Sequence, residues 1–212
     1  SIQVTLPPEL FGFSVNDIYV VDNYAFFCGQ GLERTDTVDV AVVGYFHLPD
    51  FFTGNVQINY LILYNSTSYS GYPISLEQLV AYWSVSGYDV VAYGEKKDGQ
   101  NQVVEIKNVM SPTPSCDAAD MPYSPYPYNP LFHDRLTIDD IFLTESNVVF
   151  TGHDHNMITL LANYPWYILG RKGDVVKDIC PPYNNSYYLP VADESEGFVL
   201  GTALEGDLFA MA

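Results

Sequence analysis

A thirteen-residue hairpin sequence that recurs along the chain limits what this chain can fold into. Residues 17–29, DIYVVDNYAFFCG, contain an apolar run, a short Asp-Asn turn, a second apolar run and a final glycine. Residues 140–152, DIFLTESNVVFTG, match them position by position with no gap. Runs of β-branched and aromatic residues on either side of Asp/Asn turn chemistry are typical of a β-hairpin. The chain therefore carries at least two copies of one β unit.

Two looser copies, residues 86–94 and 196–201, also end on a glycine. The glycines that end the four copies are 65, 58 and 49 residues apart, at Gly29, Gly94, Gly152 and Gly201. Periods in this range, each with three or four short strands, are typical of propeller blades or stacked β arrays. One four-stranded sheet cannot bury both of its faces alone, so neighbouring units must stack face to face.

We therefore expect an all-β, propeller-like fold of antiparallel four-stranded repeats within a single domain over residues 1–212. The expected repeats lie at about 14–65, 76–110, 136–170 and 190–212. On this interpretation the chain ends inside the fourth repeat, which fits either an incomplete ring or a truncated chain.

The composition favours strands over helices. The chain has 18 tyrosines and 12 phenylalanines, and its best helix candidate, residues 76–82, is two turns at most. We expect less than roughly 10% helix. The nearly continuous apolar run Val40–Phe46 predicts a strand buried on both faces, with Gly44 at a bulge or a close backbone approach. The alternating segment Gln102–Lys107 predicts a half-exposed strand.

The net charge of −18 narrows the classes of partner. Eight basic residues against 26 acidic ones leave no cationic face for phosphate, so nucleic acid and anionic membrane surfaces are disfavoured. No run reaches the eighteen apolar residues that a membrane-spanning helix needs. The simplest explanation of the charge is solubility. Calcium binding by clustered carboxylates is the alternative, but the sequence has no calcium loop of the EF-hand type.

The segment Asp17–Phe46 also carries a resemblance. Its Asp-Ile-x-Val strand, polar turn, Phe-Cys-Gly ending and following Val-Val-Gly-Tyr-Phe strand resemble those of secreted bacterial β-propeller-like repeat proteins. The resemblance covers about half of the chain, and it implies the fold and export but no chemistry. Few lysines, abundant Tyr and Asn, and the start at Ser1, which fits removal of a leader, also favour an exported protein (extracellular, periplasmic or cell-surface).

Two long segments rich in Tyr, Pro and Asn, Met110–Leu131 and Pro181–Pro190, are expected to be irregular loops. Aromatic faces stack on sugar rings or on proline-rich chains, and stiff loops lower the ordering cost of binding. The alternative is that these rings fill gaps in the protein's own core. The expected ligand-binding residues are Tyr123, Tyr126, Tyr128, Trp166, Tyr183 and Tyr187.

His153 and His155 are the residues that most suggest a metal site, because positions i and i+2 of a strand share a face. A third zinc ligand would have to come from His133, Asp134 or Glu145. A polar turn that happens to carry histidines explains the pattern more simply. We therefore expect no metal and no cofactor.

Paired carboxylates such as Asp139-Asp140 and those within residues 193–196 are the residue type that a glycoside hydrolase needs. Asp140, however, recurs as Asp17 in the first copy, where capping a turn is the simpler role. No Ser/His/Asp or Cys/His arrangement, P-loop or dinucleotide fingerprint is present. The preferred interpretation is a binding module for a glycan or a protein partner. A polysaccharide-acting enzyme is one alternative, and a structural component of a surface assembly is another.

The three cysteines give limited information. Cys28 lies in an apolar strand, so we expect it to be buried, with a raised pKa that disfavours a nucleophilic role. Cys116 and Cys180 lie in Tyr/Pro-rich segments. The two could form a disulfide in an oxidising compartment or remain free thiols, and the sequence leaves both possibilities open.

Overall fold

The computed structural model describes residues 8–34, 38–54, 56–63, 71–97, 99–121, 136–155, 163–179, 186–188, 204–205 and 208–209. The chain divides into two compact units, residues 1–118 and residues 119–212. Strands dominate both units, and every strand pair is antiparallel. The described helices have only six and five residues. The prediction of an all-β protein built from antiparallel sheets is confirmed.

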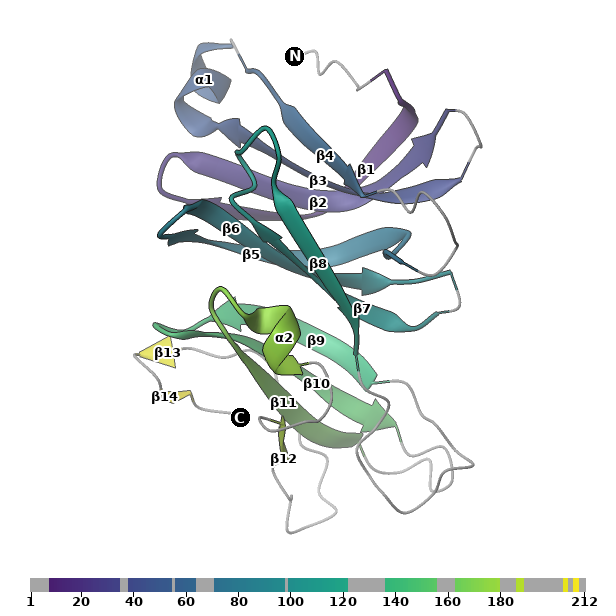
Figure 1. Cartoon of the computed structure of the whole chain (residues 1–212), viewed down its shortest axis with the longest axis vertical. Helices are drawn as coiled ribbons and strands as arrows, with labels where there is room; N and C mark the ends of the chain where they lie inside the picture. The colour runs from purple at the N-terminus through teal and green to yellow at the C-terminus, as the bar shows by residue number, and fades with distance from the viewer. Residues whose placement is uncertain are drawn as a thin grey trace. The chain divides into compact units, whose positions relative to one another are not determined.

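The first sheet, sheet A, is a meander in which each strand pairs with the next one along the chain (Figure 1). Its first turn is formed by Asp22 and Asn23, and Asp22 has a positive φ of 52°, a conformation that Asp tolerates better than most residues. A short helix, α1 (Leu48–Thr53), follows the third strand and ends at Gly54 in the left-handed conformation. The strands are β1 (Leu10–Val21), β2 (Tyr24–Glu33), β3 (Asp39–His47) and β4 (Asn59–Leu63).

The second sheet, sheet B, is a meander of the same order. Residues 76–82, which include the best helix candidate of the sequence, lie in its first strand. The expected half-exposed strand Gln102–Lys107 is also wrong, because this strand lies between two neighbours and its residues 102–106 are buried. The strands are β5 (Ser75–Ser84), β6 (Gly87–Glu95), β7 (Asn101–Lys107) and β8 (Ser115–Asp120).

The strand β8 lies inside a segment that the sequence predicted to be irregular. The prediction of a continuous loop from Met110 to Leu131 is therefore wrong over Ser115–Asp120. The segment SCDAAD has weak strand propensity, so its strand conformation depends on hydrogen bonding to the neighbouring strand of sheet B.

The second unit contains a third four-stranded meander, sheet C. A short helix, α2 (Val175–Ile179), packs against its third strand. Strands β13 (Leu204–Glu205) and β14 (Leu208–Phe209) form a separate two-stranded pair. The strands of sheet C are β9 (Leu136–Leu143), β10 (Asn147–His155), β11 (Asn163–Arg171) and β12 (Ser186–Tyr188).

All three sheets carry a β-bulge in the first strand, directly beside the glycine that ends the repeated sequence. The pairs at this point are Val15 with Gly29, Leu76 with Gly94 and Ile138 with Gly152, and in each case the next residue of the first strand is skipped. A Cβ on Gly29 would lie 1.9 Å from the carbonyl oxygen of Ser14, and one on Gly94 would lie 1.8 Å from that of Ser75. The glycine recurs because the bulge brings the backbone of the first strand too close for any side chain.

These bulges give a common register for the three sheets. Residues 24–27, 90–93 and 148–150 lie in the second strand of sheets A, B and C, respectively. The corresponding segment of the fourth expected repeat, residues 198–200, lies outside the described residues.

Sheets A and B pack face to face and share one apolar core. In sheet A the core residues Phe26 and Cys28 lie an odd number of positions before Gly29. In sheet B the core residues Val90 and Ala92 lie an even number of positions before Gly94. Because successive residues of a strand point to opposite faces, the two sheets meet through opposite faces of the repeat. The continuous apolar strand β3 is buried on both faces from Val40 to Gly44, as predicted. The expected close backbone approach at Gly44 is confirmed, because a Cβ there would lie 2.8 Å from the carbonyl oxygen of Asn59, and it would also overlap the Phe27 ring.

The bulges of sheets A and B are joined by hydrogen bonds. Asn16 Nδ2 donates to the carbonyl oxygen of Leu76 at 2.8 Å and to Ser75 Oγ at 3.1 Å. Asp17 Oδ2 accepts from the backbone N–H of Leu79 at 3.0 Å, and its Oδ1 accepts from the N–H of the next residue at 2.9 Å. The equivalent residue of sheet C, Asp140, accepts the same local bond at 2.9 Å. The recurring aspartate therefore lies at the bulge within a strand, so the expected role of capping a turn is wrong, although the contacts of Asp17 are structural.

The side of sheet A that does not face sheet B is mostly apolar, and we call it the outer face of sheet A. Residues of its two central strands are largely buried, whereas Val15, Ile18 and Val20 of β1 are exposed. Its residues are Leu10, Phe13, Val15, Ile18 and Val20 of β1, Ala25, Phe27, Gly29, Gly31 and the buried Glu33 of β2, Val40, Val42, Gly44 and Phe46 of β3, and Tyr60 and Ile62 of β4.

Candidate functional site

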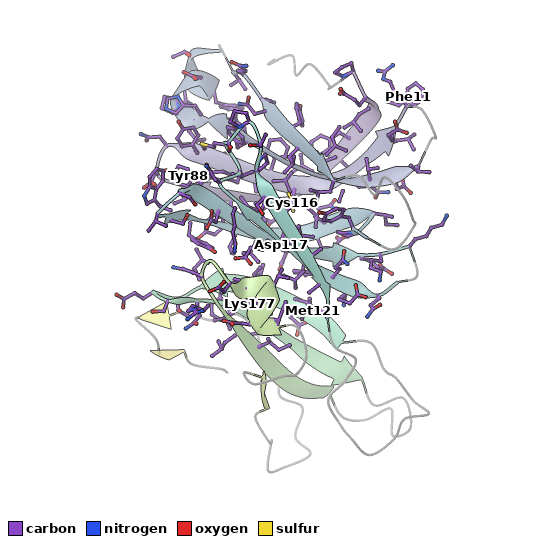
Figure 2. The ribbon with its side chains drawn as sticks, in the orientation of Figure 1. Phe11, Tyr88, Cys116, Asp117, Met121 and Lys177 are labelled. Carbon is purple, nitrogen blue, oxygen red and sulfur yellow. The ribbon has the colours of Figure 1, made fainter. Side chains whose placement is uncertain are left out.

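A cluster of aromatic and acidic side chains lies where the β1–β2 and β5–β6 hairpins turn. We call it the Trp83 cluster, and it comprises Asp22, Tyr24, His47, Trp83 and Tyr88. Trp83 and Tyr88 are directly opposite each other on β5 and β6, and their rings meet edge to face at 4.8 Å. Trp83 is 67% exposed although it is a large apolar residue. Figure 2 shows Tyr88 at one edge of unit 1 and Phe11 near the opposite edge.

Tyr88 joins sheet B to sheet A at this edge. Its ring lies 5.5 Å from that of Tyr24 and 5.3 Å from that of Phe26, and its hydroxyl donates to Asp22 Oδ2 at 2.6 Å. The hydrogen bond to this carboxylate, together with burial, raises the pKa of Tyr88 to about 12. Tyr88 therefore remains a hydrogen-bond donor at neutral pH and fixes the carboxylate of Asp22 at the surface.

The ring contacts continue from Tyr24 to His47. Their ring centroids are 5.2 Å apart, and His47 Nδ1 lies 3.2 Å from Asp50 Oδ2. The side chains of His47 and Asp50 are both more than a third exposed. The result is a continuous series of four rings flanked by two carboxylates. Such a surface offers ring faces for stacking and oxygens that accept hydrogen bonds from hydroxyl groups.

Most of the ligand-binding residues predicted from the sequence lie outside the described residues. These are Tyr123, Tyr126, Tyr128 and Tyr183. Trp166 lies in β11, opposite Gly152 on one side and Tyr188 on the other, and Tyr187 lies in β12 opposite Tyr167. The structure thus brings the segments that carry Trp166 and Tyr187 together as neighbouring strands. Their role in binding stays a prediction.

The sequence interpretation missed the Trp83 cluster. The sequence feature that could have indicated it is Trp83, which lies three residues before the Ser86-Gly87 turn at the start of the looser copy 86–94. The looser copy of the repeat begins only at Ser86, so the sequence interpretation did not include β5 in the hairpin that places Trp83 opposite Tyr88.

The structure tests only part of the metal hypothesis for the histidine pair. His153 and His155 lie in β10 at positions opposite Pro165 and Asn163, and their side chains are outside the description. Glu145 lies in the turn before β10, at the other end of the strand. Six residues of strand place it roughly 20 Å from His153, so Glu145 is wrong as a third ligand. Among the described residues, no group of three His, Cys, Asp or Glu side chains could hold a metal ion.

The described cysteines are unsuited to nucleophilic chemistry. Cys28 is completely buried in the shared core, and burial raises the pKa of its thiol, as predicted. Burial also raises the pKa of Cys116, with a further contribution from the neighbouring charge of Asp117. Cys28 and Cys116 are free thiols, and Cys180, for which the sequence left a disulfide with Cys116 open, lies outside the described residues.

Comparisons with protein-family models, with curated proteins and with solved structures found no match. The helices in the described part of the chain are too short to cross a membrane. The chemistry of the Trp83 cluster therefore has to be interpreted from its own geometry.

Proposed function

We propose that this protein is an exported, propeller-like binding module that recognises a neutral glycan through exposed aromatic rings. The observation that carries the proposal is Trp83, a ring 67% exposed at the end of a hairpin and held in place by the buried ring of Tyr88. A ring that is already fixed loses little conformational entropy when a ligand stacks on it.

The chemistry of the surroundings favours a sugar over other ligands. With a net charge of −18 the protein repels anions, so an anionic ligand is disfavoured. Asp22 and Asp50 supply acceptors beside the rings, which suits a ligand rich in hydroxyl groups. The Tyr/Pro-rich segments, with Tyr123, Tyr126 and Tyr128, would supply a second set of rings. Each contact would be weak alone, so we expect binding mainly to polymers.

The propeller-like part of the proposal is supported by the packing of sheets A and B. Two meanders with the same bulge and glycine meet through opposite faces of one repeat, which is the stacking that successive blades require. Export is supported by the resemblance described above and by the acidic, lysine-poor composition.

The test is a glycan array with quantitative binding to the best polysaccharide. We expect Trp83→Ala to weaken binding at least tenfold, which corresponds to about 1.4 kcal/mol, with little change in melting temperature because most of the side chain is exposed. Phe11→Ala is the matched control, since it removes another half-exposed ring near the opposite edge of unit 1. A triple Tyr123, Tyr126 and Tyr128 to Ala variant measures the contribution of the loops.

Two results would overturn the proposal. Equal binding by the wild type, Trp83→Ala and the triple variant would show that neither ring set recognises the ligand. Turnover of a polysaccharide in a hydrolysis screen on the same sample would favour the alternative, a polysaccharide-acting enzyme.

A further inference from the structure

The Trp83 cluster combines an open ring surface with negative charge. Trp83 is 67% exposed, and its neighbour Tyr88 donates a hydrogen bond to Asp22 Oδ2 at 2.6 Å. Asp22 is exposed, and in the described part of the chain no lysine or arginine forms an ion pair with it. The cluster therefore presents a carboxylate beside aromatic rings without a cationic side chain to neutralise it.

The Trp83 ring and the Asp22 carboxylate are close enough to act on one ligand. The ring centroids of Trp83 and Tyr88 are 4.8 Å apart, and the hydroxyl of Tyr88 holds Asp22. These contacts keep the carboxylate within about 10 Å of the Trp83 ring, which is also the screening length in about 0.1 M salt. A cation on the ring would therefore be attracted by both groups.

The opposite edge of unit 1 shows that this protein already pairs an exposed ring with a cation. There the guanidinium carbon of Arg34 lies 4.8 Å from the centroid of the Phe11 ring, and Phe11 is 53% exposed (Figure 2). Tryptophan is the stronger ring for such a cation–π contact. Among the described residues, however, no lysine or arginine lies over the Trp83 ring. The ring best suited to a cation is thus the one without a cation from its own chain.

We propose that the Trp83 cluster is a binding site for a quaternary ammonium group, which lies on the exposed ring of Trp83 near the carboxylate of Asp22. The trimethylammonium group of choline is the simplest example. Such a group has no N–H to satisfy, so ring faces and negative charge are enough to recognise it. The net charge of −18 adds a general attraction for cations. The inference goes beyond the proposed glycan binding, because the attraction arises from charge and not from hydroxyl groups.

Titration of the protein with choline, followed by NMR of the choline methyl protons, tests the proposal. The comparison ligand is the neutral isostere of choline in which carbon replaces nitrogen. We expect the wild type to bind choline about tenfold more tightly than this isostere, because only choline carries the charge. Trp83→Ala should lose choline binding, whereas Phe11→Ala should retain it. Sodium chloride keeps the ionic strength constant throughout.

Asp22→Asn separates the charge of the cluster from its packing. The amide oxygen of asparagine can still accept the hydrogen bond from Tyr88, so the variant loses only the charge. We expect choline binding to weaken by about threefold or more, and binding of the neutral isostere to stay the same. Asp39→Asn is the matched control, because it removes the same charge from an exposed position at the other end of β3 from His47. This control should bind choline as the wild type does.

Vesicles of phosphatidylcholine distinguish two sources of the quaternary ammonium group. Cosedimentation of the wild type but not of Trp83→Ala would identify a lipid headgroup, and choline binding without cosedimentation would identify a soluble ligand. Equal affinity of the wild type for choline and its neutral isostere would overturn the proposal. Unchanged choline binding in Trp83→Ala would also overturn it. These measurements contain no glycan, so their outcome is independent of the glycan array.

Discussion

Sheets A and B are the same unit built twice, and they differ most in what covers them. Both are four-stranded meanders with a bulge opposite a glycine, so the local geometry of the repeat is reproduced. Leu79 is nevertheless buried in sheet B, whereas Ile18 is more than half exposed at the equivalent position of sheet A. The comparison shows that the sequence of a hairpin determines its register, while the neighbouring sheet determines how much each apolar residue stabilises the fold.

The bulges of the two sheets also differ in what they bind. In sheet A the bulge carries Asn16 and Asp17, which reach across to sheet B. In sheet B the equivalent residues are Glu77 and Gln78, and Glu77 accepts a hydrogen bond from Ser75 of its own strand at 2.8 Å. Both copies of the repeat therefore have the bulge, but the hydrogen bonds made by the residues at the bulge differ between the copies.

The largest expected effect tests the feature that the two sheets share. Gly29→Ala and Gly94→Ala should each destabilise the protein by about 3 kcal/mol or more, because the added Cβ would overlap a backbone carbonyl that cannot move without breaking the bulge. Gly12→Ala is the control, since a Cβ there would meet nothing within 4 Å. Urea unfolding of the three variants measures the changes. If Gly29→Ala and Gly94→Ala destabilised the protein as little as the control, the bulge would not explain why the glycine recurs.

The next largest effect tests the feature that separates the sheets. Leu79→Ala should cost about 2 to 5 kcal/mol, because it removes a completely buried side chain from the shared core. Ile18→Ala, at the equivalent position, should cost less than about 1 kcal/mol, because the side chain is more than half exposed. Urea unfolding of the two variants gives the comparison. An equal loss of stability in both variants would contradict the difference in burial between the two sheets.

Much of the fold could be predicted because its strands are locally encoded. Apolar runs on either side of Asp22-Asn23 and Glu145-Ser146 predicted the hairpins, and the recurring glycine allowed the copies to be aligned. The reason for that glycine was not visible, because the close approach of Ser14 to Gly29 joins residues fifteen positions apart. The packing of one sheet on the next could not be predicted for the same reason.

The errors arose where tertiary contacts override local preference. The segment LEQLVAY contains good helix formers, yet it forms β5 because both sides of the strand supply apolar residues to a buried surface. The polar residues Gln102 and Glu105 suggested solvent, but β7 is a central strand and both are buried. The Trp83 cluster combines side chains from four separate segments of the chain, so no single stretch of sequence could predict it.

The smallest effect concerns Tyr88, which links the two sheets at the Trp83 cluster. Its pKa rises from an ordinary value near 10 to about 12 in the folded protein, because it donates a hydrogen bond to Asp22 and is buried. Below pH 10 the hydroxyl is protonated in both the folded and the unfolded chain, so the contribution of the bond to stability is complete. Between pH 10 and 12 the unfolded chain releases this proton first, and stability falls as the pH rises.

Tyr88→Phe should therefore cost about 1 to 2 kcal/mol at pH 7, because the hydrogen bond to the carboxylate is lost. The gap between the wild type and the variant should narrow as the pH rises above 10. Urea unfolding at several pH values from 7 to about 11.5 measures that gap. Burial also raises the pKa of Tyr19, Tyr45, Tyr60 and Tyr72, but those residues are present in both proteins, so the difference isolates Tyr88. A gap that stays constant up to pH 11.5 would mean that Tyr88 stabilises the contact between the sheets through its ring alone.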